Sequence, residues 1–524
     1  MRDVGVRQSA TYKFLNSRFV STNSKNGWHT RPIFLALNSD GAGYTAPIPP
    51  PSGESRMRAC FASLLLAMPA FAQVPLGASA DWPVDEVTLV NGAKFQGLIV
   101  EDNPLGMTFQ TVKRPSGRPT LTFTTFFAKK EIDKVSKLGD GDRATLRARL
   151  AELDGNGAGE RLRMNGVELV SVPWLGRVDG AKRYRDDQFE LLSAAPEEVT
   201  RRAAVRLEQI YTAFARFMPP RFDPDRPTSV ELAGDLDQYR QLLKPRAGQV
   251  LNAAVFLPAE NRILCGTDLR RLGDELHRTR LLHLQQLAAT DKYEKEIREL
   301  YKGSKPDLDR FSATVKRERE KVYAADREND RTFDAATRRL FAILYHEAFH
   351  SYATTFVYPA RSAVEIKAGK GTGELPRFFN EGLAQLFENP VIEAGELRIG
   401  HADPERLKRI REWLNGKGKP GDPPLLVPLA DLLKAGKETF LAAHANQQAS
   451  SDRTYLTCWG LAFYLLFERH LVGTAAFDDY LKSLNTGADP AKAFAELVGQ
   501  DLPAFEKDWH EYLRKLQPDG SLRK

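Results

Sequence analysis

The chain has 524 residues, of which 42% are hydrophobic and 27% are charged, a composition ordinary for soluble globular proteins with room for two or three domains. Its net charge is +7, but residues 1–72 hold eight Lys or Arg and only three Asp or Glu. The rest of the chain has 67 basic and 65 acidic residues, a balance that excludes the charge pattern of a nucleic-acid-binding protein.

The N-terminal part of the sequence has the features of a leader. Residues 57–72 begin with Met-Arg, continue as "ACFASLLLAMPAFA" and end in a small-x-small pattern, which predicts a secretory signal peptide. The apolar run is too short to serve as a stable membrane anchor. Residues 1–56, rich in Ser, Asn, Gly and Pro, are predicted to be an over-extended gene start or a disordered extension. We therefore expect an exported protein, periplasmic or secreted.

Short β-strands are predicted next, over residues 84–136. "EVTLV" and "AKFQGLIV" flank Asn91-Gly92, a dipeptide typical of hairpin turns, and "GMTFQTV" and "TLTFTTFF" continue the pattern. Four or five strands in so short a stretch predict a small SH3-like, barrel-like module. The Gly- and Asp-rich residues 137–183 are predicted to be a linker.

Strands and helices alternate after residue 185. "QFELLSA" and "PTSVELAG" read as strands around a helix at 196–217, and "LNAAVFL" and "RILCG" read as a strand pair. Residues 268–332 are highly charged and predict a helical insertion broken near Gly303, on which His277 and His283 are solvated. From residue 333 onward the sequence predicts helices almost throughout. The predicted fold class is α+β, with a mixed α/β lobe and a mainly helical lobe together spanning 185–516.

Two cysteines remain once Cys60 has left with the leader. Cys265 and Cys458 could form one disulfide in an oxidising compartment or stay as two buried thiols, and the sequence leaves both alternatives open.

The segment "AILYHEAFHSY" contains candidate metal ligands and a candidate catalytic base. His346, Glu347 and His350 form an H-E-x-x-H pattern inside a stretch of more than twenty residues without Gly or Pro. Residues four apart lie on one face of a helix, so both imidazoles can reach one ion at about 2.0–2.1 Å. Glu347 points elsewhere and can contact a water at that ion. The pattern predicts a catalytic metal site on a buried helix.

A second helix supplies the third ligand. "LPRFFNEGLAQLFE" places Glu381 thirty-one residues after His350, which leaves a loop long enough for the helix to fold back beside the first. Gly382 permits a close approach between helices. Two histidines and one carboxylate are the protein ligands of one class of catalytic zinc site. Glu374 and Glu388 are the alternatives to Glu381.

These motifs resemble those of a known group. H-E-x-x-H followed by N-E-G-L-A is similar to the gluzincin metallopeptidases, the broad group that contains thermolysin and aminopeptidase N. Over residues 185–516 the chain also resembles a bacterial exported family of unknown function with peptidase-like motifs, through "YLTCWGLAFYLLFERH" and "DLPAFEKDWHEYLRKL". The resemblance implies that His346, His350 and Glu381 hold Zn²⁺, and that Glu347 is the general base and acid for hydrolysis of a peptide or protein substrate.

The chain departs from this group in two places. Thermolysin-like sequences have an acidic residue four positions after the ligand glutamate, where this chain has Gln385, so the contacts around the ligands must differ. The Gly-x-Met-Glu-Asn run of aminopeptidases is absent, which weakens an exopeptidase interpretation.

Further expectations concern the reaction. A tetrahedral oxyanion needs another donor, and Tyr455 is the candidate because related enzymes place a tyrosine on a later helix; the alternative is a core tyrosine beside Trp459. By fold analogy the substrate lies along an edge strand, at 251–257 or 261–266. The Gly-rich residues 368–374 lack the order of a phosphate-binding loop and are expected to form a flexible loop or lid.

Two other functions remain open at this stage. The chain could be a non-catalytic exported binding or scaffold protein with a peptidase-like fold, or a zinc hydrolase of a non-peptide amide. The cleavage specificity, the oligomeric state and the role of the β module do not follow from the sequence.

Overall fold

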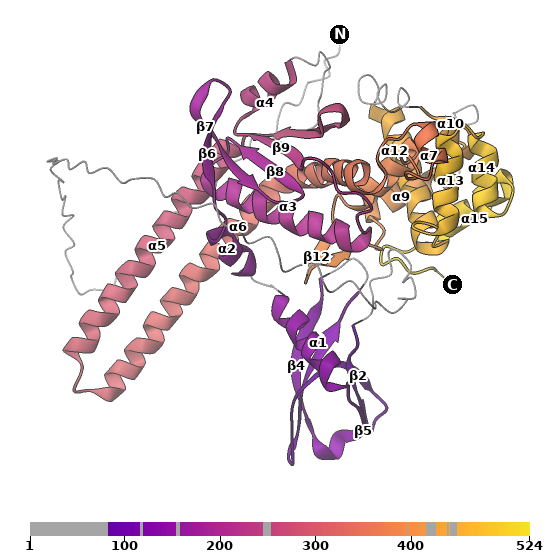
Figure 1. The fold of residues 1–524 in the computed structure, drawn as a ribbon. Coiled ribbons are helices and arrows are strands. Elements are labelled where there is room, and N and C mark those ends of the chain that lie inside the picture. The colour runs from indigo at the N-terminus through magenta and orange to yellow at the C-terminus, as the bar shows by residue number, and fades with distance from the viewer. Residues whose placement is uncertain are drawn as a thin grey trace, which may run out of the picture. The chain divides into compact units, whose positions relative to one another are not determined.

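The computed structural model describes residues 82–115, 119–153, 158–244, 253–394, 396–415, 426–436, 440 and 448–523 (Figure 1). All of them belong to one unit, Phe71–Lys524. The predicted extension at 1–56 and signal peptide at 57–72 lie outside the described residues. Among the described helices, none combines the length and apolar character that crossing a membrane requires.

The N-terminal module is a five-stranded antiparallel sheet with the strand order β4-β3-β2-β1-β5. Its strands are β1 (Asp85–Leu89), β2 (Lys94–Asn103), β3 (Gly106–Lys113), β4 (Leu121–Ala128) and β5 (Ile132–Ser136). The Asn91-Gly92 turn joins β1 to β2, with Gly92 at φ 81° as the hairpin requires. The described parts of β4 and β5 do not pair with each other, so the sheet stays open and the predicted barrel is not formed.

The predicted linker at 137–183 is also corrected. It contains α1 (Asp140–Glu152), α2 (Ala158–Asn165), β6 (Val170–Trp174) and the start of β7 (Arg177–Arg185). Of the described residues that suggested a linker, Asp140 and Asp142 lie in the first turn of α1, Gly176 has φ 77° between β6 and β7, and Asp179 and Gly180 lie within β7. Short elements joined by turns that contain Gly and Asp therefore have a composition similar to that of a linker.

The second sheet has six strands in the order β10-β11-β9-β8-β7-β6. The remaining strands are β8 (Phe189–Ser193), β9 (Thr228–Ala233), β10 (Ala254–Leu257) and β11 (Arg262–Gly266), and β9 pairs in parallel with both β8 and β11. Helix α3 (Glu197–Phe217) packs its apolar face into the main core together with these strands, and α4 (Leu236–Leu243) follows β9. Strand β10 is an edge, whereas β11 lies inside the sheet, so of the two predicted edge segments only the first is an edge.

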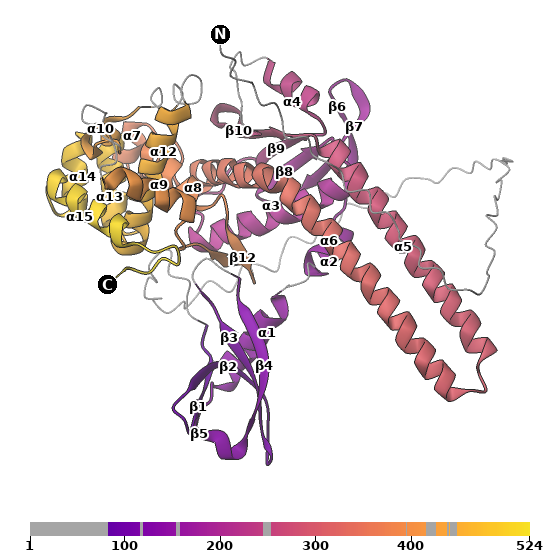
Figure 2. The ribbon, with the colours of Figure 1, turned by 180° about the vertical axis from the view of Figure 1, so that it is seen from behind.

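The charged segment forms a helical hairpin. Helix α5 (Leu269–Leu300) and helix α6 (Lys305–Tyr352) run side by side in opposite directions, and the chain turns between them near Gly303, as predicted (Figure 1). The second helix does not stop at residue 332, however. The whole helix has 48 residues, a length of about 72 Å, and runs without a break into the H-E-x-x-H segment (Figure 2). The charged insertion and the motif thus share one uninterrupted helix.

Buried ion pairs tie this hairpin to the sheet lobe. The side chain of Arg202 on α3 is 2% exposed, donates to Asp330 on α6 at 2.7 Å and lies over the ring of Phe333. Arg280 on α5 donates to the same carboxylate, also at 2.7 Å. Because breaking a buried pair leaves an uncompensated charge, these contacts hold α6 in one place against α3.

The C-terminal lobe is mainly helical, as predicted. Its elements are α7 (Ala363–Lys367), α8 (Arg377–Leu386), α9 (Pro404–Leu414), α10 (Leu429–Lys434), α12 (Gln448–Phe463), α13 (Ala475–Asn485), α14 (Pro490–Val498), α15 (Leu502–Lys515) and the hairpin β12 (Val391–Glu393)–β13 (Glu396–Arg398). Its buried residues join those of the sheet lobe in one continuous core. Cys265 and Cys458 are both buried and free, so of the two alternatives the thiols are confirmed.

Candidate metal centre

The two histidines of the motif lie in the last two turns of α6. Leu344, Phe349 and Tyr352 bury the other faces of this segment in the main core. The hydroxyl of Tyr352 donates to the carbonyl oxygen of Met218 at 2.6 Å, which fixes the end of the helix against the end of α3. The helix was predicted to be buried, and the structure confirms it. Its side chains are therefore held before any ligand arrives.

Helix α8 brings the third residue. Glu381 is 1% exposed and lies on the second turn of α8, which begins after Pro376. A Cβ atom on Gly382 would lie 2.4 Å from the carbonyl oxygen of Cys458 and 2.7 Å from Cβ of Ala462, both on α12. The close helix approach predicted for Gly382 is thus observed. Only glycine lets α8 and α12 approach this closely, so the packing fixes the position of Glu381.

Three donor groups converge at this point. Nε2 of His346 lies 3.0 Å from Nε2 of His350, and the two nitrogens lie 3.3 and 3.5 Å from the carboxylate oxygens of Glu381. Two ligand atoms about 2.0–2.1 Å from one tetrahedral zinc ion lie about 3.3 Å from each other. The three buried side chains therefore have the spacing that a single metal ion requires.

The far nitrogen of each ring is fixed by an acceptor. Nδ1 of His346 donates to Oε1 of Glu388 at 2.9 Å, and Nδ1 of His350 donates to Oδ1 of Asn380 at 3.0 Å. A ring that donates from Nδ1 presents a lone pair at Nε2 when it is neutral. Both lone pairs then point at the same place. Two such nitrogens repel unless a proton or a cation lies between them.

Glu388 is therefore not the third ligand, which the sequence had left as an alternative. Its carboxylate lies between the Nδ1 side of His346 and the guanidinium of Arg406, which also donates to the carbonyl oxygen of Gln385 at 3.0 Å. It takes the orienting role that an acidic residue four positions after the ligand would have had. Gln385, which occupies that position, instead donates to the carbonyl oxygens of Glu381 and Tyr455.

Burial and the neighbouring charges shift the pKa values of the site residues in opposite directions. Burial favours the neutral ring of His346, but the hydrogen bonds and charges of Glu381 and Glu388 outweigh it and raise the pKa of His346 to about 10. Burial raises the pKa of Glu381, but the two histidines outweigh it, so the pKa lies well below its usual value. Arg377, one turn earlier on α8, lies 2.6 Å from Oε1 of Glu381. The carboxylate is thus ionised and oriented.

Glu347 lies beside this cluster and faces the sheet. Its Oε2 accepts a hydrogen bond of 2.8 Å from the backbone N–H of Phe256 on β10. The expected edge strand and the expected base are therefore in direct contact. This contact aims the carboxylate without placing it among the three converging donors.

Tyr455 lies on α12, partly buried against the main core and stacked edge-on against Phe440. Burial is the main reason that its pKa is raised, and the charges of Glu381 and Glu347 add to the effect. The tyrosine is therefore protonated and within electrostatic range of the centre, which is compatible with both roles considered from the sequence.

The other histidines singled out from the sequence lie elsewhere. His277 is exposed on α5, as predicted, but the prediction that His283 is solvated is wrong, because its side chain is mostly buried and its Nδ1 pairs with Asp326 of α6 at 3.1 Å. Glu374, the remaining alternative ligand, has its backbone carbonyl bonded by Asn485 and is not part of the converging cluster.

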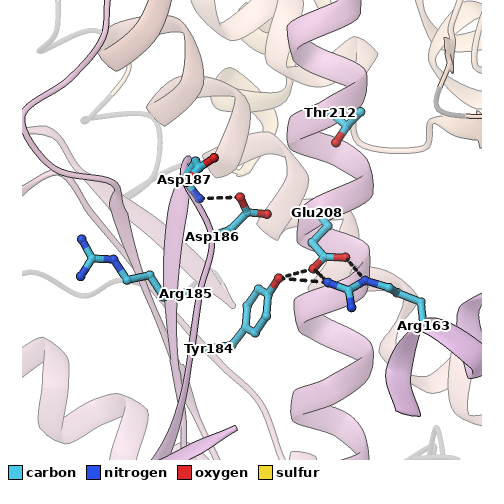
Figure 3. A pocket seen from close by; sticks show the side chains of 7 residues that line it. All are labelled: Arg163, Tyr184, Arg185, Asp186, Asp187, Glu208 and Thr212. Carbon is cyan, nitrogen blue, oxygen red and sulfur yellow. Dashed lines mark hydrogen bonds and ion pairs between the residues drawn. The ribbon is translucent and has the colours of Figure 1, made fainter. Parts of the chain in front are cut away.

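A polar pocket lies on the sheet lobe, apart from the motif residues (Figure 3). Its lining includes Arg163 from α2, Tyr184 from β7 and Glu208 from α3. Both Arg163 and Tyr184 direct their polar groups at the Glu208 carboxylate, so these charges satisfy one another. We assign no chemistry to it.

The sequence did not reveal the roles of Asn380, Arg377 and Phe256. Asn380 is the first residue of N-E-G-L-A and Arg377 lies four residues before Glu381, so both were within a quoted motif. Phe256 acts through its backbone, which no side-chain pattern signals.

Comparison with known proteins adds no relative: neither a family model, nor a curated protein, nor a solved structure matches this chain. The similarity to gluzincins thus rests on the quoted motifs alone.

Proposed function

We propose that the protein is an exported zinc-dependent peptidase of the gluzincin type. The observation that carries the proposal is the convergence of His346 Nε2, His350 Nε2 and the Glu381 carboxylate at 3.0–3.5 Å, with Glu347 beside them on the same helix. Export rests on the predicted signal peptide alone.

The donor set fits zinc. Two imidazole nitrogens and one carboxylate oxygen, each buried and each held by a further hydrogen bond or ion pair, leave a fourth tetrahedral position open. When bound, the ion would supply a water of lowered pKa and would polarise the scissile carbonyl.

Glu347 is proposed as the group that moves protons. Its carboxylate accepts a proton from the attacking water and returns it to the leaving amine. The N–H of Phe256 holds the carboxylate in place from the edge strand. That an extended substrate aligns with β10 is proposed by fold analogy alone.

Tyr455 is proposed to donate a hydrogen bond to the oxyanion of the tetrahedral intermediate. Its raised pKa keeps the phenol protonated over the working pH range. Tyr455→Phe should lower kcat about 10²-fold with little change in KM, by analogy with the loss of one oxyanion donor. An unchanged kcat would show that Tyr455 only packs in the core.

The decisive experiment combines metal analysis with peptide digestion. Purified protein should contain one zinc per chain, and a peptide-library digest should show cleavage that stops when the metal is chelated. Absence of stoichiometric zinc, or zinc without any cleavage, would favour a binding protein with a peptidase-like fold. Cleavage confined to non-peptide amides in a substrate panel would favour the alternative function, a zinc hydrolase of a non-peptide amide.

A matched pair of variants locates the base. Glu347→Gln should keep the zinc and lose hydrolysis, whereas His346→Ala should lose both. Hydrolysis surviving in the first variant would show that another group takes the proton.

A further inference from the structure

Arg377 lies on a solvent-accessible side of the candidate metal centre. Its side chain is 34% exposed, whereas those of His346, His350 and Glu381 are 13%, 6% and 2% exposed. It is the first residue of α8, and its Nη2 lies 2.6 Å from Oε1 of Glu381. A molecule that reaches the three ligands from this side therefore lies beside the guanidinium.

Most of the hydrogen-bonding capacity of Arg377 is unused. Among the described residues, its only ion pair is the one with Glu381. Its Nε atom is buried and has no hydrogen-bond partner in the described part of the chain. A guanidinium has five N–H donors in a planar fork, and one carboxylate oxygen occupies only part of that fork. Buried donors in folded proteins nearly always have an acceptor, so this guanidinium is suited to receive one from a bound molecule.

The second arginine near the centre is different. Arg406 donates from Nη1 to the carbonyl oxygen of Gln385 at 3.0 Å and from Nη2 to Oε2 of Glu388. Two protein acceptors thus hold its guanidinium behind His346, where it orients Glu388. Of these two arginines, only Arg377 combines an exposed position with donors that the described residues do not use.

Two aromatic rings extend the site beside Arg377. The guanidinium carbon of Arg377 lies 6.0 Å from the centroid of the Phe440 ring, and that ring lies 6.0 Å from the ring of Tyr455. Burial is the main cause of the raised pKa of Tyr455, and the charge of Arg377 partly opposes the rise, so the two side chains are near each other. A substrate that meets the proposed oxyanion donor is therefore also near Arg377.

The charges at the centre favour an anionic ligand. The carboxylates of Glu347, Glu381 and Glu388 and the guanidiniums of Arg377 and Arg406 lie at or beside the ligands. Three negative and two positive charges become a total of +1 when a divalent ion is bound by two neutral imidazoles. One negative charge on the substrate would neutralise this surplus, and Arg377 offers it a partner.

We propose that Arg377 is a specificity residue that binds a carboxylate of the substrate next to the scissile bond. The inference rests on the proposed hydrolysis, since it names the class of peptide that the same centre accepts. The carboxylate can come from the C-terminus of a peptide or from an acidic side chain. Both sources present the same two oxygens to a guanidinium, and two pairs of probes separate them.

The test measures binding instead of cleavage. Zinc-loaded Glu347→Gln protein is titrated by calorimetry with N-acetylated peptides in two matched pairs. The first pair is AAFAA as the free acid and as the amide, and the second is AEFEA and AQFQA, both as amides. We expect the acidic member of at least one pair to bind about five- to tenfold more tightly than its neutral partner. The pair that shows the preference identifies the source of the carboxylate.

Variants assign the preference to one side chain. Arg377→Gln should abolish it and leave the affinity for the neutral peptides within about twofold, whereas Arg377→Lys keeps the charge without the fork and should retain part of it. Arg406→Gln is the matched control, because it removes a positive charge from behind His346 and should leave the preference unchanged. Competition with a chromophoric chelator gives the zinc affinity of each variant, so that the peptides are compared at full occupancy.

Three results would overturn the proposal. They are equal binding within both pairs by the Glu347→Gln protein, a preference that survives in Arg377→Gln, and an equal weakening of zinc and of all four peptides in Arg377→Gln. The last result would show that the arginine only holds Glu381.

These outcomes are independent of the proposed hydrolysis. An acidic preference without any cleavage by the unmodified protein would refute the hydrolysis and retain the role of Arg377. Equal cleavage of acidic and neutral peptides would do the reverse. If the protein holds no zinc, the same titration of the metal-free chain decides, because Arg377 is not a ligand.

Discussion

Glu388 provides the sharpest test of the metal centre, because its role followed from the structure and not from the motif. Its carboxylate accepts from Nδ1 of His346 at 2.9 Å. Glu388→Gln keeps an acceptor but removes the charge. A hydrogen bond to a charged group contributes about 1.5–3 kcal/mol and a neutral one about 0.5–1.5 kcal/mol, so the loss is about 1–1.5 kcal/mol. Zinc should therefore bind about tenfold more weakly in Glu388→Gln, and up to about 100-fold more weakly in Glu388→Ala.

The pH of the measurement affects this result. Glu388 also helps to raise the pKa of His346 to about 10, so a proton competes with the metal for that ring. Loss of the Glu388 charge lowers this pKa, so protons compete less with the metal in the variant, and the difference from the normal protein is largest at low pH. The loss of affinity should accordingly be smaller at about pH 6 than at about pH 9.

Competition with a chromophoric chelator measures the affinity directly. Glu374→Gln is the matched control, because it removes the same charge from the segment that precedes α8, outside the converging cluster. We expect it to bind zinc like the unmodified protein. Equal effects of the two variants, or no effect of Glu388→Gln, would refute the orienting role.

The remaining predictions concern the same centre. Glu347→Gln should retain zinc and lose about 10²–10⁴-fold in kcat for any peptide that the protein cleaves; normal turnover would contradict it. Because His346 is protonated below its raised pKa, zinc binding near neutral pH should release a proton and tighten as pH rises, which calorimetry in buffers of different ionisation enthalpy detects; heats independent of buffer would contradict it. Gly382→Ala should lower the free energy of unfolding by about 1–3 kcal/mol in urea, since its Cβ would meet the carbonyl oxygen of Cys458, whereas Gly436→Ala meets open space and should be neutral; equal midpoints would refute the packing argument.

The local parts of the structure were predictable because their signals are local. The hairpin at Asn91-Gly92, the strands of the second lobe and the break near Gly303 each depend on a few neighbouring residues, and all are found. The open edge of the β module was not predictable. Whether a curled sheet closes depends on pairing between its first and last strands in space, which no short pattern encodes.

The sequence by itself determined that His346 and His350 share one face of a helix with Glu347 beside them, since the spacing of an α-helix is fixed by its backbone. It also determined that a glycine next to Glu381 would allow close packing. Only the tertiary structure decided among Glu374, Glu381 and Glu388, because these residues are separated from the histidines by a loop whose path no periodicity describes. The fold selected Glu381 for the centre and placed Glu388 behind His346. It also brought the N–H of Phe256 to Glu347, since contacts between distant segments arise from packing.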